Sequence, residues 1–294
     1  MKHKKLSHIA LIVGDFALFF GTEAWVEMLF LFGAAGAIGF RAHSAQAAQG
    51  LITSMFYSGA LYDLELKFLD VIQLLYYPVL VLGLLAFLLA RTGSMEKARR
   101  DIRLQLPVRT KFLPVLPVIA VGAFLAVTAI FALIPEDAPI MVEYAQASEM
   151  LLDTATPFLS FLVTVVCAPF VEEFFFRGLI YNHLKVVFPK RKWIALLLQG
   201  LLFGVAHGQL LWILYAALLG LVFGMVYDYF DSLPTSIFIH LLFNFSNYLP
   251  WPETMFEGTY TLLIVLFSAL LGLSLILLLL ALGKRKESNP LKAG

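Results

Sequence analysis

Long apolar runs, separated by short polar stretches, follow one another along almost the whole chain. A helix that crosses a membrane needs about 20 mostly apolar residues at a rise of 1.5 Å per residue. Runs of this kind lie near residues 9–40, 69–90, 112–134, 157–188, 193–210, 211–227, 233–249 and 259–283. The pattern therefore predicts an all-α, polytopic bundle of about eight transmembrane helices.

The first run is too long for one straight span. It contains Asp15, Glu23 and Glu27, so an interfacial segment followed by a span is one reading of it. The basic opening, residues 1–5, resembles the start of a signal peptide. The nearest small-x-small site, residues 45–47, lies too far downstream for cleavage, so we expect an uncleaved first helix.

The charges between the runs indicate how the chain is oriented. Lys and Arg accumulate in cytoplasmic loops of membrane proteins. With eight spans and both termini in the cytoplasm, every basic cluster lies on the cytoplasmic side and every acidic loop lies opposite. The basic clusters are at residues 2–5, 91–111, 190–192 and 284–286, and the acidic loops at 63–65, 136–153 and 253–257.

The composition agrees with a chain that is solvated mainly by lipid. Hydrophobic residues make up 61% and charged residues 14%, with a mean hydropathy of +0.86, whereas roughly half of the residues of soluble domains are apolar and about a quarter are charged. The single Cys167 excludes an intramolecular disulfide framework and a multi-cysteine metal site.

We see no repeat or soluble domain, so we expect residues 1–294 to form a single integral membrane domain. The positive-inside bias accounts for the basic stretch 91–111, and we expect no nucleic-acid partner.

Ionisable groups at membrane depth are costly and by default indicate function. Glu172, Glu173 and Arg177 lie inside the 157–188 run. Successive residues of a helix point about 100° apart, so the two carboxylates face different directions. Arg177 follows Glu173 by four residues, a favourable spacing for an ion pair, which leaves Glu172 as the freer carboxylate and a candidate general base. A salt bridge that only locks helices together is the alternative.

Three glycines four residues apart, Gly200, Gly204 and Gly208, lie around His207. Such a stripe of small residues lets a neighbouring helix approach closely. The histidine would then lie beside the contact between two helices. A structural histidine and glycines that serve packing alone explain the same pattern.

His240 and Asn244 are four residues apart and share one face of a helix. Both side chains can donate hydrogen bonds to one small target, as the stabilisation of an oxyanion requires. The alternative is hydrogen bonding between helices, worth roughly 0.6–2 kcal/mol in membranes.

Two further groups receive structural interpretations. Ala216, Gly220 and Gly224 form a second small-residue stripe, which we assign to helix packing. Asp228 and Asp231 lie near a predicted turn, and we expect them to be turn and capping groups.

The set Glu172, His207, His240 and Asn244 contains no plausible nucleophilic serine or cysteine, which favours direct attack by water. Glu172 would accept a proton from that water, and His207 would orient the water or share the proton. His240 and Asn244 would stabilise the oxyanion. Zinc bound by Glu and two His is the alternative, disfavoured because no H-E-x-x-H helix is present and the ligands come from three separate runs.

The order and spacing of these groups resemble the three motifs of the CPBP family, the CAAX proteases and bacteriocin-processing enzymes, which include the type II CAAX prenyl endopeptidases. The residues that carry the resemblance are Glu172-Glu173-x-x-x-Arg177, Phe203-x-x-x-His207 and His240-x-x-x-Asn244. The resemblance covers about residues 155–250 and marks them as the catalytic core. Outside this segment the similarity is one of hydrophobicity only.

The resemblance implies an intramembrane, glutamic-type endopeptidase without cofactor or essential metal. Glu172 and His207 would activate water, His240 and Asn244 would form the oxyanion site, and Glu173, Arg177 and Phe203 would support them. The implied substrate is a peptide or protein, with prenylated CAAX-type proteins and bacteriocin-related peptides as candidates. We expect a multi-pass protein in the plasma membrane of a prokaryote.

Two other functions stay open. A non-catalytic immunity or scaffold protein of the same family would use these residues to hold its helices together. A proton- or ion-coupled transporter would use the intramembrane Glu and His as relays. Transporters often contain repeated halves, and residues 1–150 contain no second copy of the motif segment, so the transporter ranks last.

Overall fold

The computed structural model describes residues 2–41, 44–152 and 156–251, together with residues 261, 264, 265, 268 and 272. Every regular element in these ranges is a helix, so the all-α prediction is confirmed. The chain forms two compact units, residues 1–98 with 145–175 and residues 99–144 with 176–294. The predicted run at 259–283 lies almost wholly outside the described residues.

Among the described residues, four helices are long and apolar enough to cross a membrane. The chain is therefore an integral membrane protein, while the number of spans and the side of each terminus stay predictions. The four are Lys5–Ala37, Leu69–Thr92, Pro157–Val187 and Leu210–Phe230, and shorter apolar helices cover Val115–Phe131, Lys192–Val205 and Leu233–Ser246.

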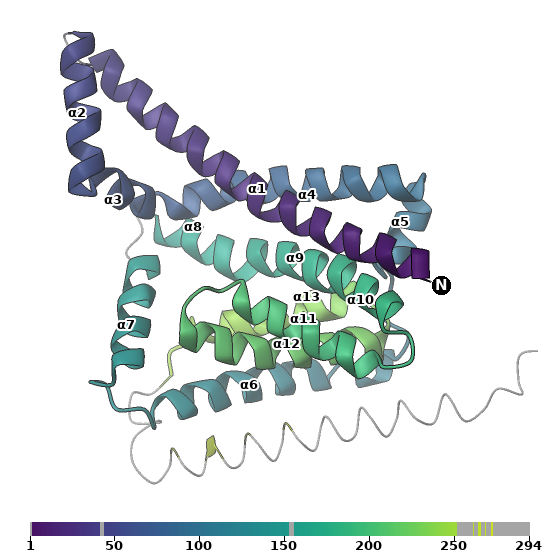
Figure 1. The fold of residues 1–294 in the computed structure, drawn as a ribbon. Coiled ribbons are helices and arrows are strands. Elements are labelled where there is room, and N and C mark those ends of the chain that lie inside the picture. Colours follow the sequence, from purple (N-terminus) through teal and green to yellow (C-terminus); the bar gives the residue numbers. More distant parts are fainter. Residues whose placement is uncertain are drawn as a thin grey trace, which may run out of the picture. The chain divides into compact units, whose positions relative to one another are not determined.

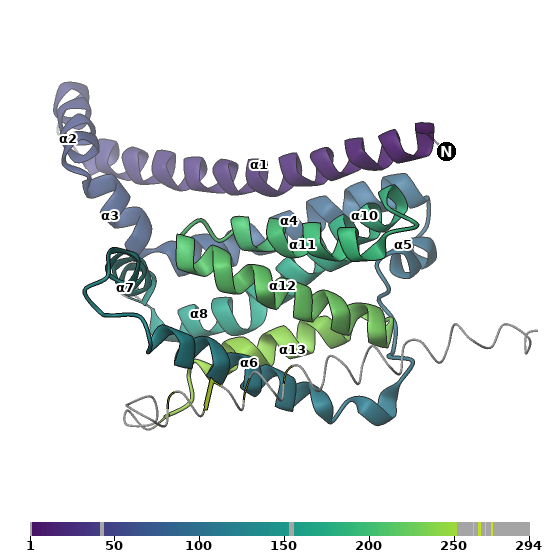
Figure 2. The ribbon, with the colours of Figure 1, turned by 60° about the horizontal axis from the view of Figure 1, so that its bottom comes forward.

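The first unit is built around α1 and α4, which lie side by side (Figures 1 and 2). The first apolar run is one continuous helix of 40 residues, without a break between an interfacial segment and a span. At 1.5 Å per residue it is about 60 Å long, twice the hydrocarbon thickness of a bilayer. The elements of this unit are α1 (Lys2–Arg41), α2 (Ala45–Ser58), α3 (Ala60–Lys67), α4 (Leu69–Thr92), α8 (Pro157–Phe161), η2 (Leu162–Cys167) and α9 (Ala168–Glu173).

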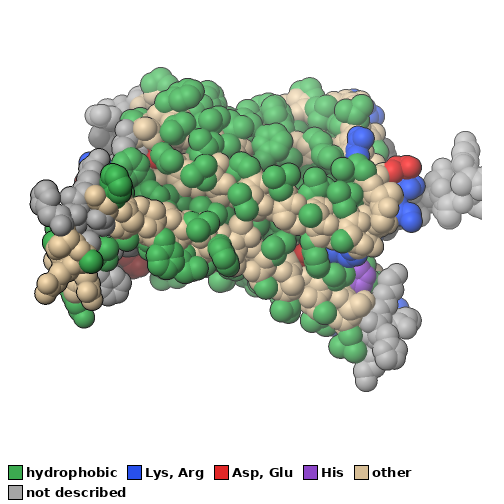
Figure 3. Space-filling model, turned by 90° about the horizontal axis from the view of Figure 1, so that it is seen from above, with side chains coloured by type: hydrophobic (Ala, Val, Ile, Leu, Met, Phe, Trp, Pro, Cys, Tyr) green, Lys and Arg blue, Asp and Glu red, His purple; other side chains and the backbone are tan. Residues whose placement is uncertain are grey.

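The sequence of α4 explains which of its faces is buried. Residues at intervals of four line one side of a helix, and the side that holds Ile72, Leu80 and Leu88 is buried. Leu75 and Leu82 lie on another side, where they are 61% and 65% exposed. Figure 3 shows hydrophobic side chains over most of the face drawn, with charged side chains gathered mainly at one end.

The second unit contains two antiparallel helices in close contact, α11 and α12 (Figures 1 and 2). Gly200 and Gly204 of α11 face α12, where an added Cβ would meet backbone atoms of Ala217 at 3.0 and 2.9 Å. The elements of this unit are η1 (Thr110–Phe112), α6 (Val115–Phe131), α10 (Asn182–Val187), α11 (Lys192–Val205), α12 (Leu210–Phe230) and α13 (Leu233–Ser246). Three elements cross the boundary between the units: α5 (Met95–Asp101), α7 (Pro139–Leu152) and η3 (Phe174–Tyr181).

The predicted stripe of three glycines is correct for only two of them. Gly208 lies beyond the end of α11 with φ = +77°, and no atom lies within 4 Å of the position of its missing Cβ. This left-handed backbone is one that glycine adopts without steric cost. Gly208 therefore makes the turn between α11 and α12, whereas Gly200 and Gly204 make the helix contact.

Candidate active site

The two adjacent glutamates of the first motif lie on α9, in the first unit. Glu173 is fully buried and Glu172 is partly exposed, in agreement with the expectation that they face different directions. In this unit α9 packs on α4, and Glu172 lies within electrostatic reach of Tyr76 and Tyr77 of α4. Glu172 is thus the more accessible of the two carboxylates.

The helix that carries the first motif changes its hydrogen bonding directly after Glu173. Residues Phe174–Tyr181 form a π-helix, as do Leu162–Cys167 upstream. A π-helix pairs residues five apart, in place of four, and often occurs at functional sites. The spacing argument that paired Arg177 with Glu173 in preference to Glu172 assumed an α-helix. That ion pair therefore stays a prediction, and the spacing no longer selects between the two glutamates.

Arg177 is fully buried in the second unit. Its Nη2 donates to the carbonyl oxygen of Gly220 at 3.3 Å. Its Cζ lies 4.3 Å from the ring centroid of Phe203 and 5.4 Å from that of Phe223. The guanidinium is therefore held by one carbonyl and by the faces of two aromatic rings.

His207 lies in the turn that follows α11 and not on the helix itself. Its Nδ1 is 2.8 Å from the carbonyl oxygen of Phe203, and the two rings meet edge to face at 4.8 Å. The 14 residues of α11 cover about 21 Å, less than the 30 Å of a bilayer core. With Lys192 at the membrane surface, the turn would lie at membrane depth, where irregular backbone is tolerated if it lines protein or a water-filled cavity.

His240 is buried on α13, only 4% exposed, and packs against the same aromatic rings. Its ring lies 5.8 Å from that of Phe203 and 4.7 Å from that of Phe223. Asn244 follows one turn later on the helix and is partly exposed. Phe203 thus contacts both histidines, which brings the second and third motifs together around one ring.

The structure places the candidate residues in two groups. Phe203, His207 and His240 meet in the second unit, with Arg177 against the Phe203 ring and Asn244 on the same helix as His240. Glu172 and Glu173 belong to the first unit. The approach of Glu172 to His207 therefore stays a prediction.

No three or more His, Cys, Asp or Glu side chains come together as a metal site within the part of the chain that the structure describes. The expectation that the site works without metal rests on the spacing of the motifs, and chelators test it.

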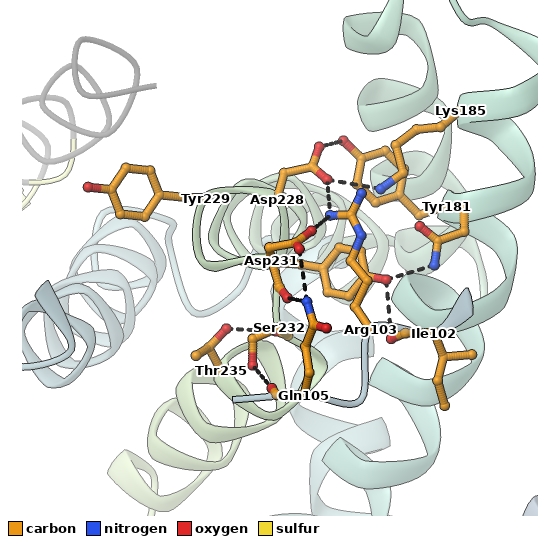
Figure 4. Close-up of polar contacts among 12 residues, drawn as sticks. Ile102, Arg103, Gln105, Tyr181, Lys185, Asp228, Tyr229, Asp231, Ser232 and Thr235 are labelled. Carbon is orange, nitrogen blue, oxygen red and sulfur yellow. Dashed lines mark hydrogen bonds and ion pairs between the residues drawn. The ribbon is translucent and has the colours of Figure 1, made fainter. Parts of the chain in front are cut away.

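At the end of α12, a polar network joins segments that are far apart in the sequence (Figure 4). Asp228 accepts hydrogen bonds from Arg103 Nη1 and Lys185 Nζ, each at 2.9 Å, and from the Tyr181 hydroxyl at 2.6 Å. Arg103 also pairs with Asp231 at 3.0 Å. Burial by itself would lower the pKa of Arg103, but the surrounding Tyr227, Asp228 and Asp231 raise it above its usual value.

The network also fixes the start of α13, the helix that carries His240. The carbonyl oxygen of Arg103 accepts from the Leu233 amide at 2.9 Å, and the Ser232 hydroxyl donates to the Gln105 carbonyl at 2.7 Å. Gln105 Nε2 donates to both the backbone and the carboxylate of Asp231. Asp231 ends α12 with φ = 51°, as expected of a turn residue, whereas Asp228 joins α10, α12 and the 103–105 segment and is more than a capping group.

We expect Asp228→Asn to destabilise the protein by about 1–3 kcal/mol, because Arg103 and Lys185 would lose their common carboxylate while remaining partly buried. The thermal midpoint Tm in detergent measures this loss. Asp137→Asn, the same change at an exposed acidic loop residue, is the matched control and should leave Tm unchanged. Equal Tm values for the two variants would show that the network contributes nothing to stability.

Sequence reasoning missed two buried residues beside the site, Gln199 and Phe223. A signal for Gln199 was present, since Gln199, Phe203 and His207 follow one another at intervals of four in an apolar run. Phe223 offered no signal, because a phenylalanine in an apolar helix is most often a packing residue. The partners of Asp228 were also missed, because Arg103 lies 125 residues away from it.

Comparison with known protein families finds a match over part of the chain. Residues 154–246 match the family model for Rce1-like type II CAAX prenyl endopeptidases. This segment contains the residues of all three motifs. Neither the curated proteins nor the solved structures contain a significant match to the chain.

Proposed function

We propose that this chain, whose residues 154–246 match the family model for Rce1-like type II CAAX prenyl endopeptidases, is an intramembrane endopeptidase of the CPBP family that hydrolyses a peptide bond by direct attack of water. The observation that carries the proposal is the meeting of His207 and His240 at the ring of Phe203, inside the matched segment. Because the imidazoles of His207 and His240 both pack against the Phe203 ring, we propose that they act on the same substrate group.

In the proposed reaction, Glu172 accepts a proton from water while the water oxygen attacks the carbonyl carbon of the substrate. His207 orients that water. His240 and Asn244 donate hydrogen bonds to the negatively charged oxygen of the tetrahedral intermediate. The proton held by Glu172 then passes to the leaving nitrogen, the C–N bond breaks, and an acid and an amine are released.

The proposed substrate is a peptide or protein that reaches the site at the membrane. Prenylated proteins with a C-terminal CAAX sequence and bacteriocin-related peptides are the two candidates, both taken from the family resemblance. Purified protein in detergent is incubated with peptides of each kind, and the products are identified by mass spectrometry. Cleavage by the wild type that is lost in both Glu172→Ala and His207→Ala supports the proposal.

Replacing His207 by Ala should lower kcat by about 10²–10⁴-fold, the usual contribution of a group that moves or orients a proton. EDTA or 1,10-phenanthroline should leave the wild-type rate unchanged, because the proposed reaction uses no metal. Loss of activity on chelation, restored by zinc, would contradict the water-activation scheme.

A different result would favour the non-catalytic scaffold function. In that case the wild type cleaves neither class of peptide, and the function of the protein in cells survives Glu172→Gln.

A further inference from the structure

We propose that Phe223 and Gln199 are positioning residues of this site, which orient His240. Phe223 contacts the His240 ring directly, whereas Gln199 acts through buried Arg177 and the rings of Phe203 and Phe223. The proposal rests on the proposed function, because it names residues that would orient the groups of that reaction. Neither residue belongs to the three motifs. All the contacts that carry it lie within the second unit.

The stack begins at the carbonyl oxygen of Gly220, in the middle of α12. Gln199 Nε2 donates to this oxygen at 2.7 Å and also lies 3.2 Å from the Leu196 carbonyl oxygen. Both partners are acceptors, which fixes the orientation of the Gln199 amide. Arg177 Nη2 donates to the same Gly220 oxygen at 3.3 Å. Gln199 and Arg177, both fully buried, thus share one acceptor.

Gly220 has no side chain to separate these groups. A Cβ at this position would lie 2.9 Å from the Cα of Gly200 and 3.2 Å from Cδ1 of Phe203. The two glycines therefore bring α11 and α12 close enough for Gln199 to reach the carbonyl. The sequence assigned the stripe that contains Gly220 to helix packing. Its Gly220 carbonyl oxygen also accepts a hydrogen bond from Arg177.

The next layer of the stack consists of the rings of Phe203 and Phe223. Both lie within about 6 Å of the Arg177 Cζ, the range in which an aromatic face attracts a cation. Their centroids are 6.4 Å apart with an interplanar angle of 70°, an edge-to-face arrangement that aromatic pairs prefer. Both rings lie against the buried guanidinium, so the position of Arg177 and the planes of the two rings depend on one another.

The last layer is His240. Its ring lies 4.7 Å from the Phe223 ring with an interplanar angle of 30°, a tilted arrangement, and 5.8 Å from the Phe203 ring at 80°. The imidazole therefore packs against one tilted ring and one nearly perpendicular ring. A site that stabilises an oxyanion requires its donors within about 0.5 Å and 10–20° of the productive geometry. Phe223 makes the shorter of these two ring contacts to His240 and thereby restricts the plane of its ring.

The test compares Phe223→Leu with Phe230→Leu. Both phenylalanines lie on α12 and are 1% exposed, but the ring neighbour of Phe230 among the described residues is Tyr229 and not a histidine. We expect Phe223→Leu to lower kcat by about 10–100-fold with KM unchanged, as misplacement by about 1 Å does. Phe230→Leu should leave kcat unchanged while lowering Tm to a similar extent. Gln199→Leu, with a similar volume and no donor, should lower kcat in the same way.

A second readout does not depend on activity. In protein labelled with ¹³C at the histidine rings, the His240 resonance is the one of six that disappears in His240→Gln. It should shift in Phe223→Leu, which removes the ring 4.7 Å away, and remain in place in Phe230→Leu. Equal His240 spectra in the two variants would overturn the positioning role. A shifted resonance in a protein that cleaves no peptide would support the stack and contradict the proposed function.

Discussion

Glu172→Gln should abolish peptide hydrolysis while leaving the protein folded. A glutamine of nearly the same shape cannot accept the proton from water, so we expect kcat to fall by about 10²–10⁴-fold. The Tm in detergent should fall less than in Glu173→Gln, because Glu172 is partly exposed whereas Glu173 is fully buried. Steady-state kinetics on a peptide that the wild type cleaves, together with a melting curve, measure both quantities.

The matched control is Glu173→Gln, the same substitution at the neighbouring, fully buried carboxylate. We expect it to lower Tm, because a buried charge is held by groups that its removal leaves uncompensated. The pair of variants separates a chemical role from a structural one within two adjacent residues. If Glu173→Gln abolishes turnover at wild-type Tm and Glu172→Gln does not, the two roles are assigned the wrong way round.

The second large effect is expected at Gly204. A Cβ there would lie 2.5 Å from the Ile213 carbonyl oxygen and 2.8 Å from the Ala217 Cβ. These are atoms of the backbone and of an alanine side chain, which cannot move away by a rotamer change. The helices α11 and α12 must therefore move apart. We expect Gly204→Ala to destabilise the protein by about 3 kcal/mol or more. Activity should also fall, because the amide of His207 donates to the Gly204 carbonyl.

Gly21→Ala is the control for Gly204→Ala. Gly21 also lies inside a helix, but no atom lies within 4 Å of the position of its missing Cβ. Alanine favours helix over glycine by up to about 1 kcal/mol, so Tm should be unchanged or slightly higher. The yield of monodisperse protein and its Tm provide the measurement. A Gly204→Ala protein as stable as the wild type would mean that the contact between α11 and α12 can be relaxed without cost.

The candidate site could be predicted in part because polar groups are rare in apolar helices. Glu172, His207 and His240 stand out in the sequence for this reason, and the family match includes them. Spacing also placed His240 and Asn244 on one helix, as observed. Spacing could not reveal that Phe203 touches both histidines, because the two histidines lie on different segments, and it placed His207 on a helix that in fact ends at Val205.

For the glycines and aspartates too, the sequence predicted some roles correctly and could not reveal others. Four-residue spacing correctly indicated a close helix contact at Gly200 and Gly204, but Gly208 has the same spacing and makes a turn. Asp231 ends α12 as a turn residue should. Asp228, three residues earlier, binds Arg103 and Lys185. Local geometry follows from neighbours in the sequence, whereas these partners follow from how distant segments pack.

By itself the sequence determined that this protein is helical and lies in a membrane, and it picked out most of the candidate polar residues. Lipid cannot hydrogen-bond to backbone groups, so each segment must satisfy its own as a helix, and a run of apolar residues is enough to specify one. The tertiary structure alone decided which ring each imidazole meets, which carbonyl Arg177 and Gln199 share, and where an α-helix gives way to a π-helix. Those choices depend on contacts between segments that only folding brings together, and a pattern of spacings along one segment does not encode them.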